Sequence, residues 1–206
     1  MSYLTPAESG YEPVWSVTEE EYVNQLAFSS DGNHLATACA DGSVAVYSWP
    51  EGKRLWREEV HGLGASALAW SPDNVTLATG GQDSRIIIWS GTTGAKKHTL
   101  TGGRGWVEKL AWSSRHTLAG ITDKELKLWN SEGNLVTDFA AAESTLTGVE
   151  WQDDGSLLTS AYGQVARWYP TKRQPVVESC CSTGWLHHCR RQSGGRHSSL
   201  APQKRY

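Results

Sequence analysis

Two aromatic positions recur along this chain at intervals of about forty residues. The first position holds Phe28, Trp70, Trp112 and Trp151, and the second holds Tyr47, Trp89, Trp129 and Trp168. Short apolar runs and turns rich in Asp, Asn and Gly fill each unit. This pattern indicates four short strands joined by three turns. A unit of this size must pack on copies of itself to bury both of its faces.

The most complete copy runs from His61 to Leu100. Trp70-Ser71-Pro72-Asp73 closes its first apolar run, and Ile86-Ile87-Ile88-Trp89 forms its third. The period and these motifs resemble the WD40 family of β-propellers. In that family a structural tetrad ties the strands of a blade together through a His, a Ser or Thr, a turn Asp and a Trp. The resemblance assigns this tetrad to His61, Thr79, Asp83 and Trp89.

The other units depart from the tetrad. The first has Glu19 at the His position and Tyr47 at the Trp position. In the third, Gly103 and Ala119 replace the His and the Ser or Thr. The fourth is expected to keep only Trp168, with Tyr162 in place of the turn Asp. We expect these three blades to depend more on packing than on polar networks.

The resemblance implies an all-β, WD40-type β-propeller that is incomplete, with about four four-stranded blades in an open arc. We expect a flexible lead-in over residues 1–13 and an irregular, basic, disordered tail over residues 178–206. The open ends of such an arc favour self-association through unpaired blade edges. The expected blades span residues 14–57, 58–100, 101–139 and 140–177.

A fifth unit is due after Val177 but does not appear. Trp185 stands where the next blade should begin, yet the residues that follow are rich in His, Cys, Arg and Ser and do not alternate. Back-translation of residues 187–193, read one nucleotide later, permits Thr-Thr-Val-Ala-Val-Ser-Pro. The hypothesis is a longer propeller whose reading frame changed near Trp185, which sequencing of the encoding DNA would test.

Composition excludes several functions. From Glu178 onward five Lys and Arg face a single acidic residue, so the net charge of −3 leaves the preceding residues at −7. An acidic body argues against nucleic-acid binding. The sequence lacks a long apolar run and an apolar N-terminal leader, so we expect no membrane span and a cytoplasmic location. The tail residues Cys180, Cys181 and Cys189 match no zinc-ligand spacing, and we expect no metal or other cofactor.

No catalytic residues are expected either. His61, Thr79 and Asp83 have the residue types of a hydrolytic triad, but no nucleophile elbow accompanies them. The leading interpretation is therefore a non-enzymatic protein-interaction scaffold with an unknown protein partner. Two alternatives stay open. One is a propeller enzyme or small-molecule sensor with a site in the central channel, and the other is a non-functional truncated fragment.

The partner-binding candidates come from two loop positions that face the narrow top surface in WD40 proteins. One precedes the first strand of each blade, and the other precedes the turn Asp. Exposed Tyr, Trp and Arg carry much of the binding energy at interfaces. The alternative for Trp106 is packing against a neighbouring blade. The candidates are Tyr22, Gln82, Arg104 and Trp106.

Overall fold

The computed structural model describes residues 15–170 and 176–178, which form strands and turns without a helix. They make four antiparallel four-stranded sheets. The first sheet contains β1 Val23–Phe28, β2 His34–Cys39, β3 Ser43–Ser48 and β4 Arg54–Glu59. The second contains β5 Ala65–Trp70, β6 Thr76–Gly81, β7 Arg85–Ser90 and β8 Lys96–Thr101. The third contains β9 Val107–Trp112, β10 Leu118–Thr122, β11 Glu125–Trp129 and β12 Leu135–Asp138. The fourth contains β13 Leu146–Trp151, β14 Leu157–Ala161, β15 Gln164–Trp168 and β16 Val176–Glu178.

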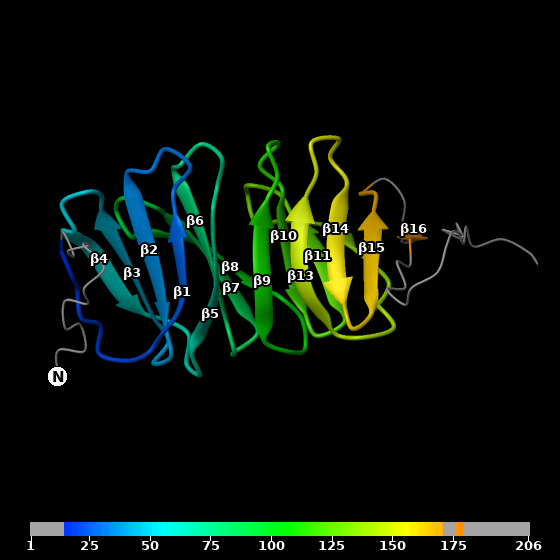
Figure 1. Ribbon diagram of the computed structural model, residues 1–206, viewed down its shortest axis with the longest axis horizontal. Coiled ribbons are helices and arrows are strands. Elements are labelled where there is room, and N and C mark those ends of the chain that lie inside the picture. The colour runs from blue at the N-terminus through cyan, green and yellow to red at the C-terminus, as the bar shows by residue number, and fades with distance from the viewer. Residues whose placement is uncertain (1–14, 171–175, 179–206) are drawn as a thin grey trace, which may run out of the picture.

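The sheets stand in a row, with the first and the fourth at opposite ends (Figure 1). Within each sheet consecutive strands pair, and the first strands β1, β5, β9 and β13 lie beside one another. The expected open arc of four-stranded blades is therefore confirmed for the described residues. The first, second and fourth blades end one or two residues beyond their expected boundaries. The predicted lead-in and tail, with the proposed frame change near Trp185, lie outside the described residues.

The two central strands of each inner sheet are mostly buried because neighbouring sheets cover both of their faces. Ile86, Ile87 and Ile88 of β7 are all buried, whereas the outermost strand β8 is largely exposed. Three apolar clusters fill the three spaces between neighbouring sheets. Each sheet therefore depends on its neighbours for its core, as expected of a stacked repeat.

The first aromatic position of each unit joins one sheet to the sheet before it. The indole Nε1–H of Trp70 donates to the backbone oxygen of Ala27 at 3.1 Å. Trp112 and Trp151 make the same bond to the sheets that precede them. Phe28 has no such donor, and its side chain is 51% exposed on the free face of the first sheet. These aromatics recur about every forty residues because each unit uses one of them to contact the sheet before it.

The turn after each of these aromatics needs a left-handed residue. The fourth residue beyond each aromatic has a φ between 59° and 79° in all four sheets. Gly, Asn and, in one case, His adopt this conformation. The residues are Gly32, Asn74, His116 and Gly155.

Candidate functional site

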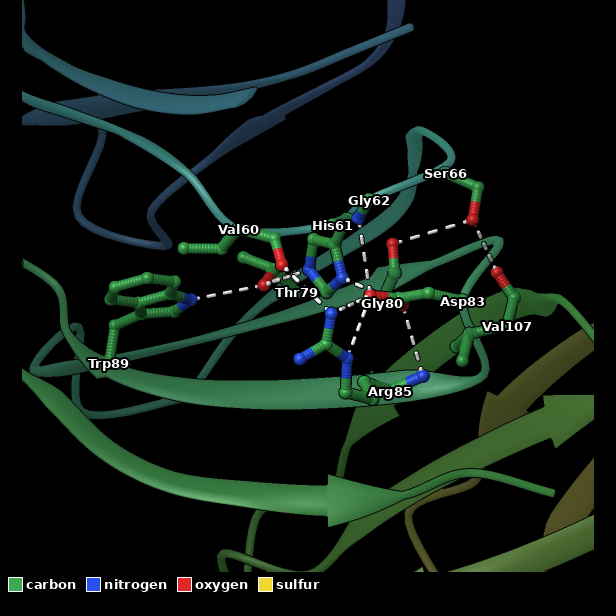
Figure 2. A network of polar contacts seen from close by, with 10 residues as sticks. All are labelled: Val60, His61, Gly62, Ser66, Thr79, Gly80, Asp83, Arg85, Trp89 and Val107. Atoms are coloured by element: carbon green, nitrogen blue, oxygen red, sulfur yellow. Dashed lines mark hydrogen bonds and ion pairs between the residues drawn. The ribbon is translucent and has the colours of Figure 1, made fainter. Parts of the chain in front are cut away.

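A chain of hydrogen-bonded side chains, most of them buried, crosses the second sheet (Figure 2). His61, from the loop between β4 and β5, places Nε2 2.9 Å from the hydroxyl of Thr79 on β6. The other ring nitrogen, Nδ1, lies 3.1 Å from a carboxylate oxygen of Asp83 in the β6–β7 turn. Trp89 on β7 donates its indole N–H to the same Thr79 hydroxyl at 3.0 Å. The four residues expected from the tetrad therefore lie in one hydrogen-bonded chain.

The protonation states of His61 and Asp83 determine which atom donates each hydrogen bond in this network. Burial lowers the pKa of His61, so its ring is neutral near pH 7. Burial alone would raise the pKa of Asp83, but hydrogen bonds from His61 and from the Arg85 backbone outweigh it and lower that pKa. The ionised carboxylate thus accepts from Nδ1–H of His61, and Nε2 accepts the Thr79 hydroxyl proton.

This geometry holds strands together and offers no nucleophile. Thr79 is fully buried, and its hydroxyl is occupied by the ring of His61 and the indole of Trp89. A substrate would have to displace both rings to reach it. The residue types of a hydrolytic triad therefore serve here as a cross-link between the β4–β5 loop and two strands.

In the first sheet a carboxylate replaces the imidazole. One oxygen of Glu19 accepts from the hydroxyl of Thr37 at 2.9 Å and from that of Tyr47 at 2.5 Å. Burial and the hydrogen bond to Glu19 raise the pKa of Tyr47 to about 12. Asp41, in the turn, bonds Arg57 of β4 instead, at 2.9 Å. A polar link thus survives in this sheet with different residues.

The fourth sheet keeps more than its Trp, which corrects the sequence prediction. The hydroxyl of Thr159 accepts the indole N–H of Trp168 at 2.7 Å. Thr159 lies opposite the residue two before Trp168, as Thr79 lies opposite the residue two before Trp89. The sequence comparison missed it because the β14–β15 turn has two residues where the β6–β7 turn has three. A fixed spacing from the Trp therefore points one residue too early.

The β10–β11 turn of the third sheet also has two residues, so the residue at the Thr position again lies one place later than the fixed spacing predicts. Gly120, and not Ala119, lies opposite the residue two before Trp129. A Cβ on Gly120 would stand 3.0 Å from the Trp129 ring, so the indole fills the space that a threonine takes elsewhere. Asp123 accepts from the hydroxyl of Thr145 at 2.7 Å. The residue at the His position, Gly103, has no side chain, so this sheet lacks the chain of bonds seen in the second.

The partner-binding candidates lie where the first strand of a sheet begins or where β6 turns into β7. The strands β1, β9 and β13 point the same way in Figure 1, so their starting ends share one side of the row. Tyr22 is 82% exposed and Trp106 is 55% exposed, while Arg104 is exposed and Gln82 is half-buried. Trp106 therefore projects into solvent over more than half of its surface.

Two exposed side chains at the same end were missed. Leu63 precedes β5 and is 67% exposed, and Tyr162 in the β14–β15 turn is 95% exposed. Both could have been predicted as partner-binding candidates, because each is a large apolar or aromatic residue in a loop next to the expected top surface. We call the exposed and half-buried side chains at this end the rim, which consists of Tyr22, Leu63, Gln82, Arg104, Trp106 and Tyr162.

Three carboxylates come close enough to suggest a cation site beside β4. Glu20, Asp41 and Glu59 surround the guanidinium of Arg57 at 3.6, 2.9 and 2.9 Å. Their negative charge thus already faces a cation of the chain itself. Among the described residues no helix is long and apolar enough to cross a membrane.

Comparison with known proteins agrees with this architecture. The family model "WD domain, G-beta repeat" matches residues 11–48 and 52–90. Bovine WD repeat-containing protein 1 is 32% identical over 48% of this chain and 17% of its own length. The rice small ribosomal subunit protein RACK1y is 30% identical over 62% of this chain and 41% of its own length. The chain thus spans less than half the length of these curated relatives.

Solved structures share the fold. The structure of U3-55K superposes with a TM-score of 0.70, at 21% identity, over 78% of this chain and 53% of that chain. The RRP9 WD40 repeats give the same TM-score at 22% identity, over 78% and 52%. Four stacked four-stranded sheets, the repeat match and these relatives lead to one conclusion. The four sheets have the fold of a WD40 propeller, and residues 11–48 and 52–90 match the WD40-repeat family model.

Proposed function

We propose that this chain is a non-enzymatic scaffold that binds a protein partner through the rim. The observation that carries the proposal is the exposure of Tyr22, Trp106 and Tyr162 at one end of the sheets. Large aromatic side chains bury much area at a small cost in conformational entropy, which suits them to interface hot spots. A cytoplasmic location stays a prediction.

The rim loops are held by the sheets behind them. The backbone amide of Ala40 donates to the carbonyl of Tyr22 at 2.8 Å, and that of Gln82 donates to the carbonyl of Gly64 at 2.9 Å. These bonds join the loop before each first strand to the β2–β3 or β6–β7 turn of the same sheet. A partner would therefore meet a pre-formed surface, which lowers the entropy lost on binding.

The test begins by capturing partners on the immobilised chain and identifying them by mass spectrometry. Affinity for the purified partner is then measured for Trp106→Ala, with Val136→Ala as the matched control. Val136 is 58% exposed but lies on β12, away from the rim. We expect Trp106→Ala to weaken binding about tenfold or more, as for a hot-spot residue, with an unchanged thermal midpoint.

Two results would overturn the proposal. One is a partner that binds both Trp106→Ala and the double variant with Tyr162→Ala as tightly as the parent chain. The other is a loss of binding for Val136→Ala equal to that for the rim variants.

A further inference from the structure

A cavity of about 180 Å³ opens between the third and the fourth sheets. Its apolar walls come mainly from Leu146, Ala166 and the ring of Trp168, and Glu143 and Gln164 add a polar edge. Phe139, from the end of the third sheet, contacts the Trp168 ring edge-on at 5.1 Å. The cavity therefore lies in the packed boundary between sheets.

In the second sheet, the place that corresponds to this cavity is filled by the imidazole ring of His61. The amides of Val60 and His61 both donate to the carbonyl of Gly42, the last residue of the preceding β2–β3 turn, and the amide of Ala142 donates to that of Lys124, the last residue of the β10–β11 turn. His61 and Ala142 each stand four positions before the first strand of their sheet. Ala142 thus occupies the place of His61, and it lines the cavity.

The remaining partners of the missing ring are in position. Trp168 donates to Thr159, as Trp89 donates to Thr79 in the second sheet. Thr159 is only 2% exposed and also lines the cavity. Within the described residues its hydroxyl makes this one bond, as acceptor, so its proton is free to donate. In the second sheet the corresponding proton is directed to the ring nitrogen of His61.

We propose that this cavity binds a small neutral azole ring, which stacks among the apolar walls and accepts the Thr159 hydroxyl proton on a ring nitrogen. The size fits, because an apolar cavity of about 150 Å³ in another protein binds benzene. His61 and its contacts are an internal template for the bound state. The ring can belong to a free azole or to a histidine side chain of a peptide, and the experiment separates these sources.

The probe is 4-methylimidazole, titrated into the full chain at about pH 8.5, where an imidazole is mostly neutral. Binding is followed by the NMR signal of the Trp168 indole N–H and by the thermal midpoint. We expect a saturable shift of that signal and a midpoint that rises with ligand concentration. Benzene should bind at least about tenfold more weakly, because it cannot accept the Thr159 proton. A short blocked peptide with a central histidine binding more tightly than 4-methylimidazole would identify a peptide as the source, and weaker peptide binding would identify a free azole.

Two variants make the test specific. Ala142→His supplies the ring from the chain itself, so it should abolish the response to 4-methylimidazole and raise the midpoint by about 2–4 °C. Ala140→His places the same ring on a neighbouring exposed residue that does not line the cavity, and it should leave ligand binding unchanged. Thr159→Ser keeps the hydroxyl and should retain binding.

Three outcomes would overturn the proposal. The first is the absence of a saturable shift of the Trp168 signal. The second is equal affinity for benzene, which would make the cavity a merely apolar void. The third is an undiminished response in Ala142→His, which would place the ligand elsewhere.

Discussion

Replacing Thr79 with valine removes the hydroxyl at the centre of the second-sheet network and keeps the shape of the side chain. The hydroxyl accepts from Trp89 and lies in hydrogen-bond contact with His61, and all three residues are buried. Each buried polar group left without a partner costs about 1–3 kcal/mol. Two such groups are left, so Thr79→Val should lower the free energy of unfolding by about 2–6 kcal/mol.

The fourth sheet supplies an internal comparison. Thr159 has one such partner, the indole of Trp168, so Thr159→Val should cost about 1–3 kcal/mol, roughly half as much. Thr99→Val, on the exposed strand β8, should change stability by less than about 0.5 kcal/mol.

Denaturant unfolding, followed by tryptophan fluorescence and by circular dichroism, gives all three values. The reasoning fails if Thr79→Val costs no more than Thr159→Val, because the His61 bond would then contribute nothing.

Three other changes test neighbouring features. A Cβ on Gly81 would lie 2.3 Å from Nδ1 of His61, whereas one on Gly62 meets nothing within 4 Å; Gly81→Ala should therefore cost about 1–3 kcal/mol and Gly62→Ala almost nothing, and equal costs in denaturant unfolding would contradict this. Burial lowers the pKa of His61, so the unfolded chain takes up that proton first as the pH falls. The His61 contribution should be complete above about pH 6.5 and decline below it, and a midpoint-against-pH profile that does not flatten in His61→Gln would refute the assignment. Leu26 is 59% and Phe28 51% exposed on the free face of the first sheet, so Leu26→Ser should lower the average mass in light scattering, and an unchanged mass would argue against self-association through that face.

Much of the fold could be predicted from the sequence because the aromatic residues mark physical contacts. Trp70, Trp112 and Trp151 recur because each bonds the sheet before it. The second-sheet tetrad could be placed because its spacing matches the full family pattern. The first-sheet link through Glu19 also follows from position alone, although its carboxylate can only accept hydrogen bonds, whereas the His61 ring accepts one from Thr79 and donates one to Asp83.

The remaining details depend on turn length and exposure, which spacing does not encode. The β14–β15 and β10–β11 turns are each one residue shorter than the β6–β7 turn. The fixed spacing from the Trp therefore did not identify Thr159 or Gly120. Leu63 and Tyr162 are apolar or aromatic and could equally well have been buried. Only the position of their loops beyond the sheets exposes them. The cavity beside Ala142 could not be predicted either. It is found only when Ala142, Thr159 and Trp168 are compared in space with their counterparts in the second sheet.

Native-state hydrogen exchange tests the central structural claim most directly, namely that the hydrogen-bonded network of His61, Thr79, Asp83 and Trp89 makes the second sheet more stable than the fourth. Its network is complete, whereas the fourth sheet keeps only the Thr159 to Trp168 bond. The slowest-exchanging amides should therefore lie in β6 and β7, with those of β14 and β15 opening at a lower free energy. Equal or greater protection in β14 and β15 would contradict the claim.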